Sequence, residues 1–343
     1  MPHKQALLRR LTRPAGNRPV MLAIAGDSAA GKSTLTRGLA EAIGSKRVAW
    51  MCVDDYHRYD REERRGLPFT PLHPACNYME VMEQHLQLLA MGESILKPVY
   101  DHRSGTLVRP ELFVPAEHVI VEGLLPLASP LSRACFDLTV YLDPPEELRR
   151  AWKVRRDTRD RGYREEEVLA ELARRESDAA TFIRPQRQYA DIVVRFAPIE
   201  GRPASEGLST TVLLRPTAPH PDLSAVLTED TREAIHLKLV RDLDGKPVDA
   251  LHVHAYASPE KSAAVKAAIW GALGVDREPP PSLGLVEAGV RSEPLAIVQL
   301  LILYHLVLAR RTHDGPGESA PPASPPASAP AAGAPSVASA VAR

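Results

Sequence analysis

Five short hydrophobic runs recur along the first 200 residues, and polar or turn-forming residues follow each of them. These runs cover residues 20–25, 47–53, 118–121, 138–142 and 191–196. Their length is typical of strands buried on both faces of a sheet. Segments with helical spacing of apolar residues lie among them, at residues 33–43, 79–91, 146–161 and 164–178. Alternating strands and helices predict an α/β fold, with a mostly parallel sheet, right-handed crossovers and helices on both faces.

The pattern changes near residue 200, where strands follow one another without long helices between them. Three such strands are expected at residues 209–214, 234–240 and 250–254. They indicate an antiparallel extension of the sheet. Two helices, near residues 259–273 and 294–310, are expected to close the fold.

Two irregular segments interrupt the first half of the chain. Residues 58–78 are rich in charge, proline and turn formers, which predicts a long functional loop. Residues 99–102 and 105–108 flank Ser104-Gly105 and predict a hairpin. The whole chain then divides into a flexible basic arm at residues 1–19, a core at 20–200, the sheet extension with its helices at 201–312 and a disordered Ala/Pro/Ser tail at 313–343.

Composition narrows the classes of partner. The 343 residues include 43 Lys and Arg against 43 Asp and Glu, so the formal net charge is zero, which argues against a broad nucleic-acid-binding surface. Three cysteines without CxxC spacing indicate neither a disulfide framework nor a zinc motif, and they favour a cytoplasmic location. The most apolar segment, residues 295–309, is too short to span a bilayer and predicts a buried helix, so no membrane partner is expected.

The run after the first predicted strand fits the phosphate-binding pattern G-x-x-x-x-G-K-S/T. It consists of Gly26, Asp27, Ser28, Ala29, Ala30, Gly31, Lys32, Ser33 and Thr34. A strand precedes this P-loop and a helix follows it, and in that setting backbone N–H groups and the helix N-terminus point at phosphates. We therefore expect ATP as the cofactor, with Lys32 on its β- and γ-phosphates and Ser33 as a ligand of Mg²⁺.

Acidic residues end several predicted strands, and ligands of such sheets bind at those ends. Asp54 and Asp55 follow the second strand, Glu122 the third and Asp143 the fourth. Phosphoryl transfer needs a metal ion on the phosphates and a base for the proton of the acceptor. We predict Asp54 as that base, with Asp55 as the alternative, and Glu122 as a holder of Mg²⁺ or its water. Asp143 precedes two prolines and is expected to begin a turn or helix.

Basic residues gather in the predicted helix at residues 146–161. They are Lys153, Arg155, Arg156, Arg159 and Arg161, with Asp157 and Asp160 among them. The cluster fits either a mobile lid, whose arginines meet the transferring phosphoryl oxygens, or a solvated helix held by salt bridges.

A second set of residues suits a phosphorylated sugar. It comprises His57, Arg61, Arg64, Arg65, Tyr100 and His102. Arginine binds a phosphate dianion through two parallel hydrogen bonds, whereas Tyr and His side chains suit sugar hydroxyls. A small-molecule sugar phosphate is therefore the expected acceptor.

In order and spacing, these motifs resemble the phosphoribulokinase family. The matching blocks are residues 26–34, Asp54-Asp55-Tyr56-His57, Lys97-Pro98-Val99-Tyr100-Asp101-His102, Val121-Glu122-Gly123-Leu124, Ala151-Trp152-Lys153, Arg156-Asp157, Arg161-Gly162 and residues 185–191. The resemblance covers roughly residues 20–310, and its later part is similar to the longer form of cyanobacteria and plants. It implies a P-loop NTPase fold of the nucleoside-kinase kind.

The resemblance also implies an activity and roles for single residues. The activity is ATP-dependent phosphorylation of ribulose 5-phosphate at its 1-hydroxyl, a Calvin-cycle reaction, in a homodimer or larger homo-oligomer. The implied roles are a base at Asp54, sugar-phosphate binding at His57 and Arg61, sugar contacts at Tyr100 and His102, metal binding at Glu122, catalysis at Lys32, Arg156 and Asp157, substrate binding at Lys153 and Arg161, and nucleotide binding at Arg187.

The chain departs from the family pattern at several positions. Plant members have a cysteine at the position of Ala30, and it pairs with one at the position of Cys52 in a redox switch. That disulfide cannot form here, and Cys52 is expected to be a buried strand residue. His73 and Ala75 replace an Asp and an Arg of the plant pattern, and Arg184 stands where the family often has Asp.

Two other interpretations stay open. A nucleoside kinase similar to uridine kinase would act on an acceptor without a phosphate, and it would not need the basic cluster of His57, Arg61 and Arg64. A nucleotide-gated regulatory protein without turnover would be expected to lack Lys32, Asp54 or Glu122, and all three are present.

Overall fold

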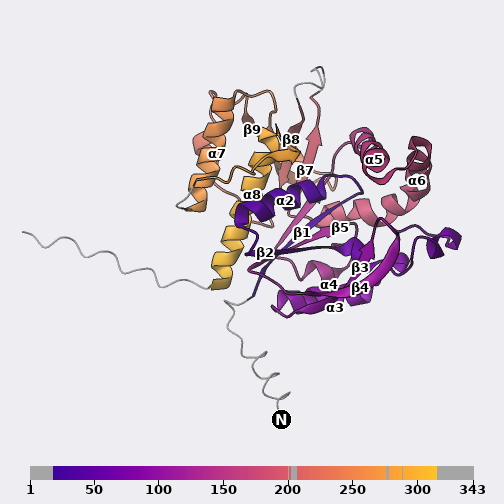
Figure 1. The fold of residues 1–343 in the computed structure, drawn as a ribbon. Coiled ribbons are helices and arrows are strands. Elements are labelled where there is room, and N and C mark those ends of the chain that lie inside the picture. The colour runs from indigo at the N-terminus through magenta and orange to yellow at the C-terminus, as the bar shows by residue number, and fades with distance from the viewer. Residues whose placement is uncertain (1–17, 200, 202–206, 276–277, 288, 315–343) are drawn as a thin grey trace, which may run out of the picture.

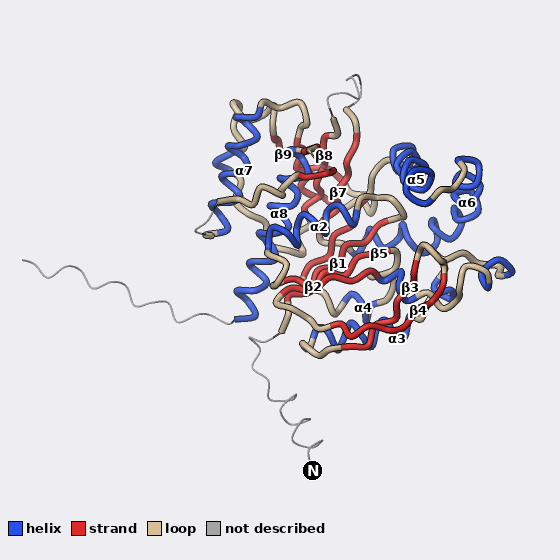
Figure 2. Tube along the Cα trace, viewed as in Figure 1, coloured by secondary structure: helices blue, strands red, loops and turns tan. Residues whose placement is uncertain are grey.

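The computed structural model describes residues 18–199, 201, 207–275, 278–287 and 289–314. Within them, all eight predicted strands join one sheet in the order β2-β5-β1-β6-β7-β8-β10-β9 (Figures 1 and 2). The first five strands in that order are parallel: β2 (Val48–Cys52), β5 (His118–Gly123), β1 (Val20–Gly26), β6 (Leu138–Leu142) and β7 (Ile192–Ala197). The other three are antiparallel: β8 (Ser209–Leu214), β10 (Pro247–Val253) and β9 (Ile235–Arg241). The predicted α/β fold with an antiparallel extension is confirmed.

Helices cover both faces of the sheet because the strands are apolar on both sides. Leu22 and Ile24 of β1 belong to a core that includes α2 (Lys32–Ile43), α7 (Pro259–Leu273) and α8 (Glu293–Asp314). Met21, the neighbour of Leu22 in the strand, faces a second core with α3 (Met79–Ala90) on the other side. Alternation of side chains along a strand therefore divides the core into two layers.

The C-terminal extension is packed into the parallel part of the fold. α8 lies against β1 and α2, and residues 294–303 along it are buried. It is the one helix in the described part of the chain that is long and apolar enough to cross a membrane, but two thirds of that stretch is buried inside the molecule. A helix enclosed in this way is a core helix, as its sequence predicts, although it continues beyond the predicted end to Asp314.

The remaining elements lie at the edges of the sheet. The hairpin of β3 (Ile95–Asp101) and β4 (Thr106–Phe113) is longer than predicted and forms a sheet of its own. A second small hairpin pairs β11 (Leu285–Glu287) with β12 (Val290–Arg291). α5 (Glu146–Arg161) and α6 (Glu165–Asp178) project together from the sheet, at the right of Figure 1, and α4 (Pro130–Arg133) is a single turn.

The predicted segment boundaries are only partly within the described residues. Most of the predicted arm and nearly all of the predicted tail lie outside them. Arg18, placed in the arm by its sequence, donates from Nε to the Ala90 carbonyl at 3.2 Å. His313 and Asp314, placed in the tail, are the last residues of α8.

Candidate active site

The P-loop connects β1 to α2 with a backbone that few residues can adopt. Gly26 has φ +149°, and a Cβ there would lie 2.8 Å from the Leu142 carbonyl, so glycine is required for the close approach of β6. Gly31 has φ +96° and Ala29 has φ 65°, both in the left-handed region. Lys32 opens α2 and folds back, with Nζ 2.9 Å from the carbonyls of both Gly26 and Asp27. The loop and the N-terminus of α2 thus form the anion-binding arrangement that the motif predicts.

Glu122 lies at the end of β5, beside the first turn of α2. Its carboxylate accepts hydrogen bonds from the hydroxyls of Ser33, at 2.9 Å, and Thr36, at 3.2 Å. Burial raises the pKa of Glu122, while the charge of Lys32 and the two hydroxyls act against that rise. Hydroxyl and carboxylate oxygens are ligands that Mg²⁺ prefers, so Ser33 and Glu122 fit the ion. The described residues contain no cluster of three or more His, Cys, Asp or Glu that could hold a metal, so phosphate oxygens and water would complete the coordination.

Asp54 and Asp55 have different environments although they are neighbours. β2 ends at Cys52, one residue earlier than predicted, and both aspartates lie in a 3₁₀ turn at Val53–Tyr56. Asp55 forms an ion pair with Lys97 and accepts from the Tyr100 amide at 3.1 Å. Asp54 accepts from the Leu124 amide at 3.2 Å and lines a shallow hollow with Asn77 and Leu124. Asp55 therefore holds the β3–β4 hairpin, and Asp54 is the better candidate for the base.

His57 presents a defined tautomer to the site. Its Nδ1 is 2.7 Å from Oδ1 of Asn77, whose amide nitrogen donates to the carbonyls of Pro71 and His73. Because that amide orientation leaves a carbonyl oxygen facing His57, Nδ1 carries the proton and Nε2 carries a lone pair. Burial lowers the pKa of His57 to about 4, so the ring is neutral near pH 7. A neutral ring with a free lone pair suits a sugar hydroxyl better than a phosphate dianion.

Tyr100 and His102 reach the same place from β3 and the turn after it. The ring centroids of His57 and Tyr100 are 4.9 Å apart, and those of Tyr100 and His102 are 5.1 Å apart. Desolvation lowers the pKa of His102, and the charge of Arg161 contributes to the lowering while that of Asp54 opposes it. The hairpin, the end of α5 and Asp54 thus surround one site, as predicted.

The two arginines predicted to bind phosphate hold protein atoms in this structure. Arg61 donates to the carbonyl of His102 at 2.7 Å and lies under Gly105, so it supports the turn of the hairpin. Arg64 is buried, donates to the Tyr59 carbonyl at 2.9 Å and is hydrogen-bonded to the Tyr100 hydroxyl. Their part in sugar-phosphate binding remains a prediction. To bind the phosphate, Arg61 and Arg64 would have to release these protein atoms.

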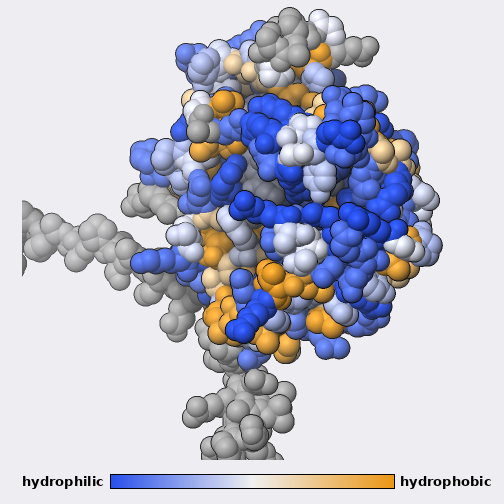
Figure 3. All heavy atoms as spheres, turned by 45° about the vertical axis from the view of Figure 1, so that its right-hand side comes forward, coloured by the Kyte–Doolittle hydropathy of each residue, from blue (hydrophilic) through white to orange (hydrophobic). Residues whose placement is uncertain are grey.

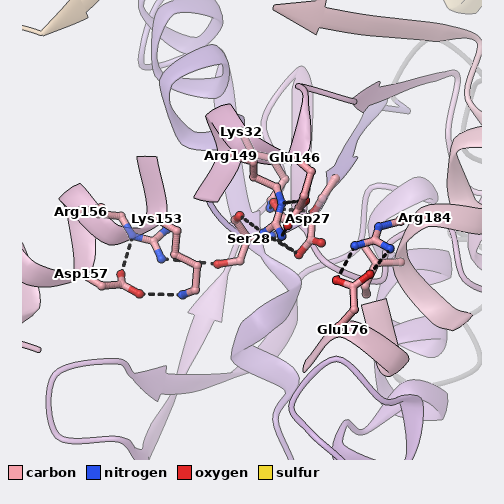
Figure 4. A network of polar contacts seen from close by, with 12 residues as sticks. Asp27, Ser28, Lys32, Glu146, Arg149, Lys153, Arg156, Asp157, Glu176 and Arg184 are labelled. Carbon is pink, nitrogen blue, oxygen red and sulfur yellow. Dashed lines mark hydrogen bonds and ion pairs between the residues drawn. The ribbon is translucent and has the colours of Figure 1, made fainter. Parts of the chain in front are cut away.

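The basic cluster of α5 is organised around one buried carboxylate (Figure 4). Asp157 pairs with Lys153 at 2.6 Å, Arg156 at 2.8 Å and Arg161 at 3.4 Å. Burial alone would raise the pKa of Asp157, but the hydrogen bonds from Arg156 and Lys153 lower it. Burial, together with the charge of Arg175, lowers the pKa of Lys153 to about 8. A carboxylate held by three cations is a weak base, so Asp157 is better suited to positioning the lid cations.

Arg187 lies in an ion network behind the P-loop. It donates to Asp143 at 2.9 Å and to Asp242 at 2.6 Å, and Asp242 also pairs with Arg215. Asp143, predicted to begin a turn or helix, therefore also holds Arg187. The predicted role of Arg187 in nucleotide binding stays a prediction.

Other residues of the site were not found from the sequence. Asn77, which orients His57, lies in the predicted functional loop of residues 58–78, but its own role was not predicted. Thr36 could have been found, because it follows Ser33 by three positions on the helix and so faces the same side. Arg184, which departs from the family pattern, makes a two-pronged pair with Glu176 at 2.6 and 2.8 Å.

The redox disulfide of the plant proteins is expected not to form here, because Ala30 replaces one of its two cysteines. Cys52, Cys76 and Cys135 are free, and Cys52 is partly buried. Burial raises the pKa of the Cys52 thiol well above its usual value, so it carries little of the reactive thiolate.

The hairpin exposes apolar side chains, among them Leu96 and Leu112. The surface over α5 and α6 is mostly hydrophilic, with apolar patches lower on the same face (Figure 3). A second shallow hollow lies there between the P-loop and the projecting helices, lined among others by Asp27, Arg149, Lys153 and Arg175. A parallel sheet, a P-loop at the end of its β1 strand, a hydroxyl–carboxylate pair beside it and a basic helix above it define a P-loop phosphotransferase site.

Comparisons with known proteins agree with that class. The model of the phosphoribulokinase / uridine kinase family matches residues 21–200, and the chain belongs to this family. Phosphoribulokinase of Synechocystis sp. is 40% identical over 182 residues, which are 53% of this chain and 55% of that protein. Uridine kinase of Alkaliphilus metalliredigens is 30% identical over 184 residues, 52% of this chain and 88% of that protein. The chain thus spans about half the length of the phosphoribulokinases that it matches.

A solved structure extends the similarity of fold beyond residue 200. Phosphoribulokinase from Rhodobacter spheroides superimposes with a TM-score of 0.53 over 73% of this chain and 95% of that one, at 16% identity. At this identity the match concerns the fold alone.

Proposed function

We propose that the protein transfers the γ-phosphoryl group of ATP, with Mg²⁺, to the 1-hydroxyl of ribulose 5-phosphate. The observation that carries this proposal is the position of Asp54. Its Oδ1 accepts from the amide of Leu124, two residues after Glu122, at 3.2 Å, and its charge acts to raise the pKa of both Glu122 and His102. A carboxylate between a metal site and a site for hydroxyls can take the proton of an incoming alcohol.

Different residues of the chain bind the phosphates, the metal ion and the acceptor in this proposal. The P-loop amides and Lys32 bind the phosphates, and Ser33 and Glu122 would hold Mg²⁺, which neutralises charge on the phosphate oxygens. His57, through its unprotonated Nε2, orients a hydroxyl of the acceptor. Arg156 and Arg161 supply positive charge from α5, and Asp157 keeps them in place.

A nucleoside acceptor is the second candidate, and one observation favours it. Arg61 and Arg64, the cations expected to bind the acceptor's phosphate, are engaged with carbonyls and with Tyr100. Uridine would not require them. The 40% identity to a phosphoribulokinase, against 30% to a uridine kinase, supports ribulose 5-phosphate as the first choice.

An assay of ADP release decides between them. Ribulose 5-phosphate, ribose 5-phosphate and uridine are offered in parallel at equal concentration, with and without Mg²⁺. The proposal expects Mg²⁺-dependent turnover with ribulose 5-phosphate and at least tenfold less with either other acceptor. Turnover with uridine alone would contradict it, and hydrolysis unaffected by any acceptor would point to a regulatory nucleotide-binding protein.

The setting of the enzyme is part of the same proposal. The three cysteines without CxxC spacing support a cytoplasmic location. The family supports an enzyme of carbohydrate metabolism, with the Calvin cycle as its pathway and a homodimer or larger homo-oligomer as its state. Light scattering of the purified chain measures the oligomeric state directly.

A further inference from the structure

The peptide between Ser28 and Ala29 is held from outside the P-loop by a buried arginine of α5. Arg149 is 5% exposed, and its Nη1 donates to the Ser28 carbonyl at 3.0 Å and lies 3.5 Å from Oδ1 of Asp27 (Figure 4). Its Nε and Nη2 donate to the two carboxylate oxygens of Glu146, at 2.8 and 2.7 Å. One guanidinium thus joins the start of α5 to the tip of the phosphate-binding loop.

The fold explains why this arginine is in reach. β6 pairs with β1 in a register that sets Leu142 beside Gly26, the first residue of the P-loop. Asp143 and two prolines follow Leu142 in the chain, and α5 begins directly after them at Glu146. Arg149 lies one turn into that helix, so its side chain reaches the P-loop and stays buried.

A hydrogen bond to a carbonyl also fixes an amide. In a trans peptide the C=O of one residue and the N–H of the next point in opposite directions. Holding the Ser28 carbonyl on Arg149 therefore turns the Ala29 N–H away from Arg149. Ala29 has φ 65°, the left-handed conformation that directs successive amides into an anion-binding nest. Without the hydrogen bond from Arg149, the Ser28–Ala29 peptide could rotate so that Ala29 leaves the left-handed conformation. The Ala29 amide would then no longer be held in place for a phosphate.

We propose that Arg149 is a positioning residue for the nucleotide: it presets the Ala29 amide for a phosphate, and Glu146 orients its guanidinium. The inference rests on the proposed function in requiring that the P-loop binds ATP. It does not depend on the identity of the acceptor. The guanidinium of Arg149 donates to Ser28 and Glu146, so its effect on nucleotide binding would pass through the loop.

Calorimetric titration of the full chain with Mg²⁺-ATP, Mg²⁺-ADP and AMP tests the proposal. Arg149→Met is expected to weaken ATP and ADP binding by about tenfold to a hundredfold, the equivalent of a lost charge-assisted hydrogen bond. AMP binding should change by less than threefold, because AMP lacks the β- and γ-phosphates that the tip of the loop at Ala29 would meet. Arg149→Lys should lie between Arg149→Met and the wild type, since lysine cannot hold Ser28 and both oxygens of Glu146. Arg150→Met, one position along the same helix, is the matched control with unchanged binding.

A double-mutant cycle separates positioning from general loss of structure. Glu146→Gln alone is expected to weaken ATP binding a few-fold, and combined with Arg149→Met it should add nothing. In steady state, the KM for ATP should rise in Arg149→Met while kcat at saturating ATP stays within about threefold. Equal losses for AMP and ATP, additive losses in the cycle, or unchanged ATP affinity in a folded Arg149→Met would each overturn the proposal. A wild-type chain that binds no ATP would instead refute the proposed function.

Discussion

Ser33 donates its hydroxyl proton to the Glu122 carboxylate over 2.9 Å, which joins the first turn of the P-loop helix to the end of the neighbouring β5 strand. To bind a cation, each of the two residues would only have to rotate its side chain until an oxygen atom faces the ion. The pair therefore brings two oxygen ligands together beside the P-loop, where a Mg²⁺ bound to the β- and γ-phosphates of ATP would lie.

Replacing Glu122 tests that preorganisation. Glu122→Gln keeps the hydrogen bond to Ser33 but removes the charge, so the Mg²⁺ concentration for half-maximal activity should rise by about tenfold or more. Thr36→Val removes only the other hydroxyl contact of Glu122, and it should change the Mg²⁺ concentration for half-maximal activity by less than threefold. A Mg²⁺ titration of initial rates measures both variants, and an unchanged Mg²⁺ requirement in Glu122→Gln would remove Glu122 from the metal site.

Asp54→Asn should separate chemistry from binding. Loss of the base is expected to lower kcat by roughly 10²–10⁴-fold while nucleotide affinity stays the same. Asp55→Asn is the matched control: it leaves buried Lys97 without its partner, so it should lower stability more than kcat. Steady-state kinetics and thermal unfolding measure the two effects. Full activity in Asp54→Asn would move the role of base to another carboxylate, with Asp157 the next to test.

Asp242 should give the protein a marked acid sensitivity. Burial would raise its pKa, but hydrogen bonds from Arg187 and Arg215 lower it to about 2 from an ordinary 3.8. A folded pKa below the unfolded one gives stability that is present above pH 4 and is lost as the pH falls through 2. Asp242→Asn should cost about 2 kcal/mol near pH 7 and flatten the dependence of unfolding free energy on pH between 4 and 2. Exposed Asp230→Asn is the control, and parallel curves for Asp242→Asn and the wild type would contradict the expectation.

Two glycines in helices should respond to alanine in opposite ways. A Cβ on Gly38 of α2 would lie 2.0 Å from Nε2 of Gln299, which is buried on α8 and accepts from the Gly284 amide at 2.8 Å. Gly38→Ala should therefore lower the free energy of unfolding by about 1–3 kcal/mol. Gly271 of α7 has open space around it, so Gly271→Ala should raise that free energy by up to about 1 kcal/mol. Denaturant unfolding measures both, and a stabilised Gly38→Ala would show that Gln299 moves aside freely.

The sequence predicted those parts of the molecule that local patterns determine. The strand at Leu138–Leu142 and the helix at Glu146–Arg161 have the predicted bounds because apolar runs and prolines mark them. The meeting of Glu122 with the P-loop followed from the rule that parallel strands end at one edge. In contrast, β2 ends early because Val53 curls into a 3₁₀ turn, which the apolar run does not reveal.

The choice of partner by long side chains could not be predicted. Arg61 and Arg64 have the composition of a phosphate site, yet they hold a carbonyl and a tyrosine hydroxyl that the hairpin brings from some forty residues away. Arg149 belonged to a charged helix face with no distinguishing motif, and only the register of β6 with β1 makes it a neighbour of Ser28. Such pairings depend on the assembled fold, so spacing alone cannot give them.

The close packing of Gly38 against Gln299 bears on whether the two parts of this fold could be separated. The strands after β7 are antiparallel, so the C-terminal extension could be taken for a separable addition to the parallel part of the sheet. However, one side of α2, the helix that follows the P-loop, is covered by α8, the last helix described. Removing the chain after β7 would expose that side of α2 to solvent, so the parallel part of the fold is expected to lose stability without the C-terminal extension.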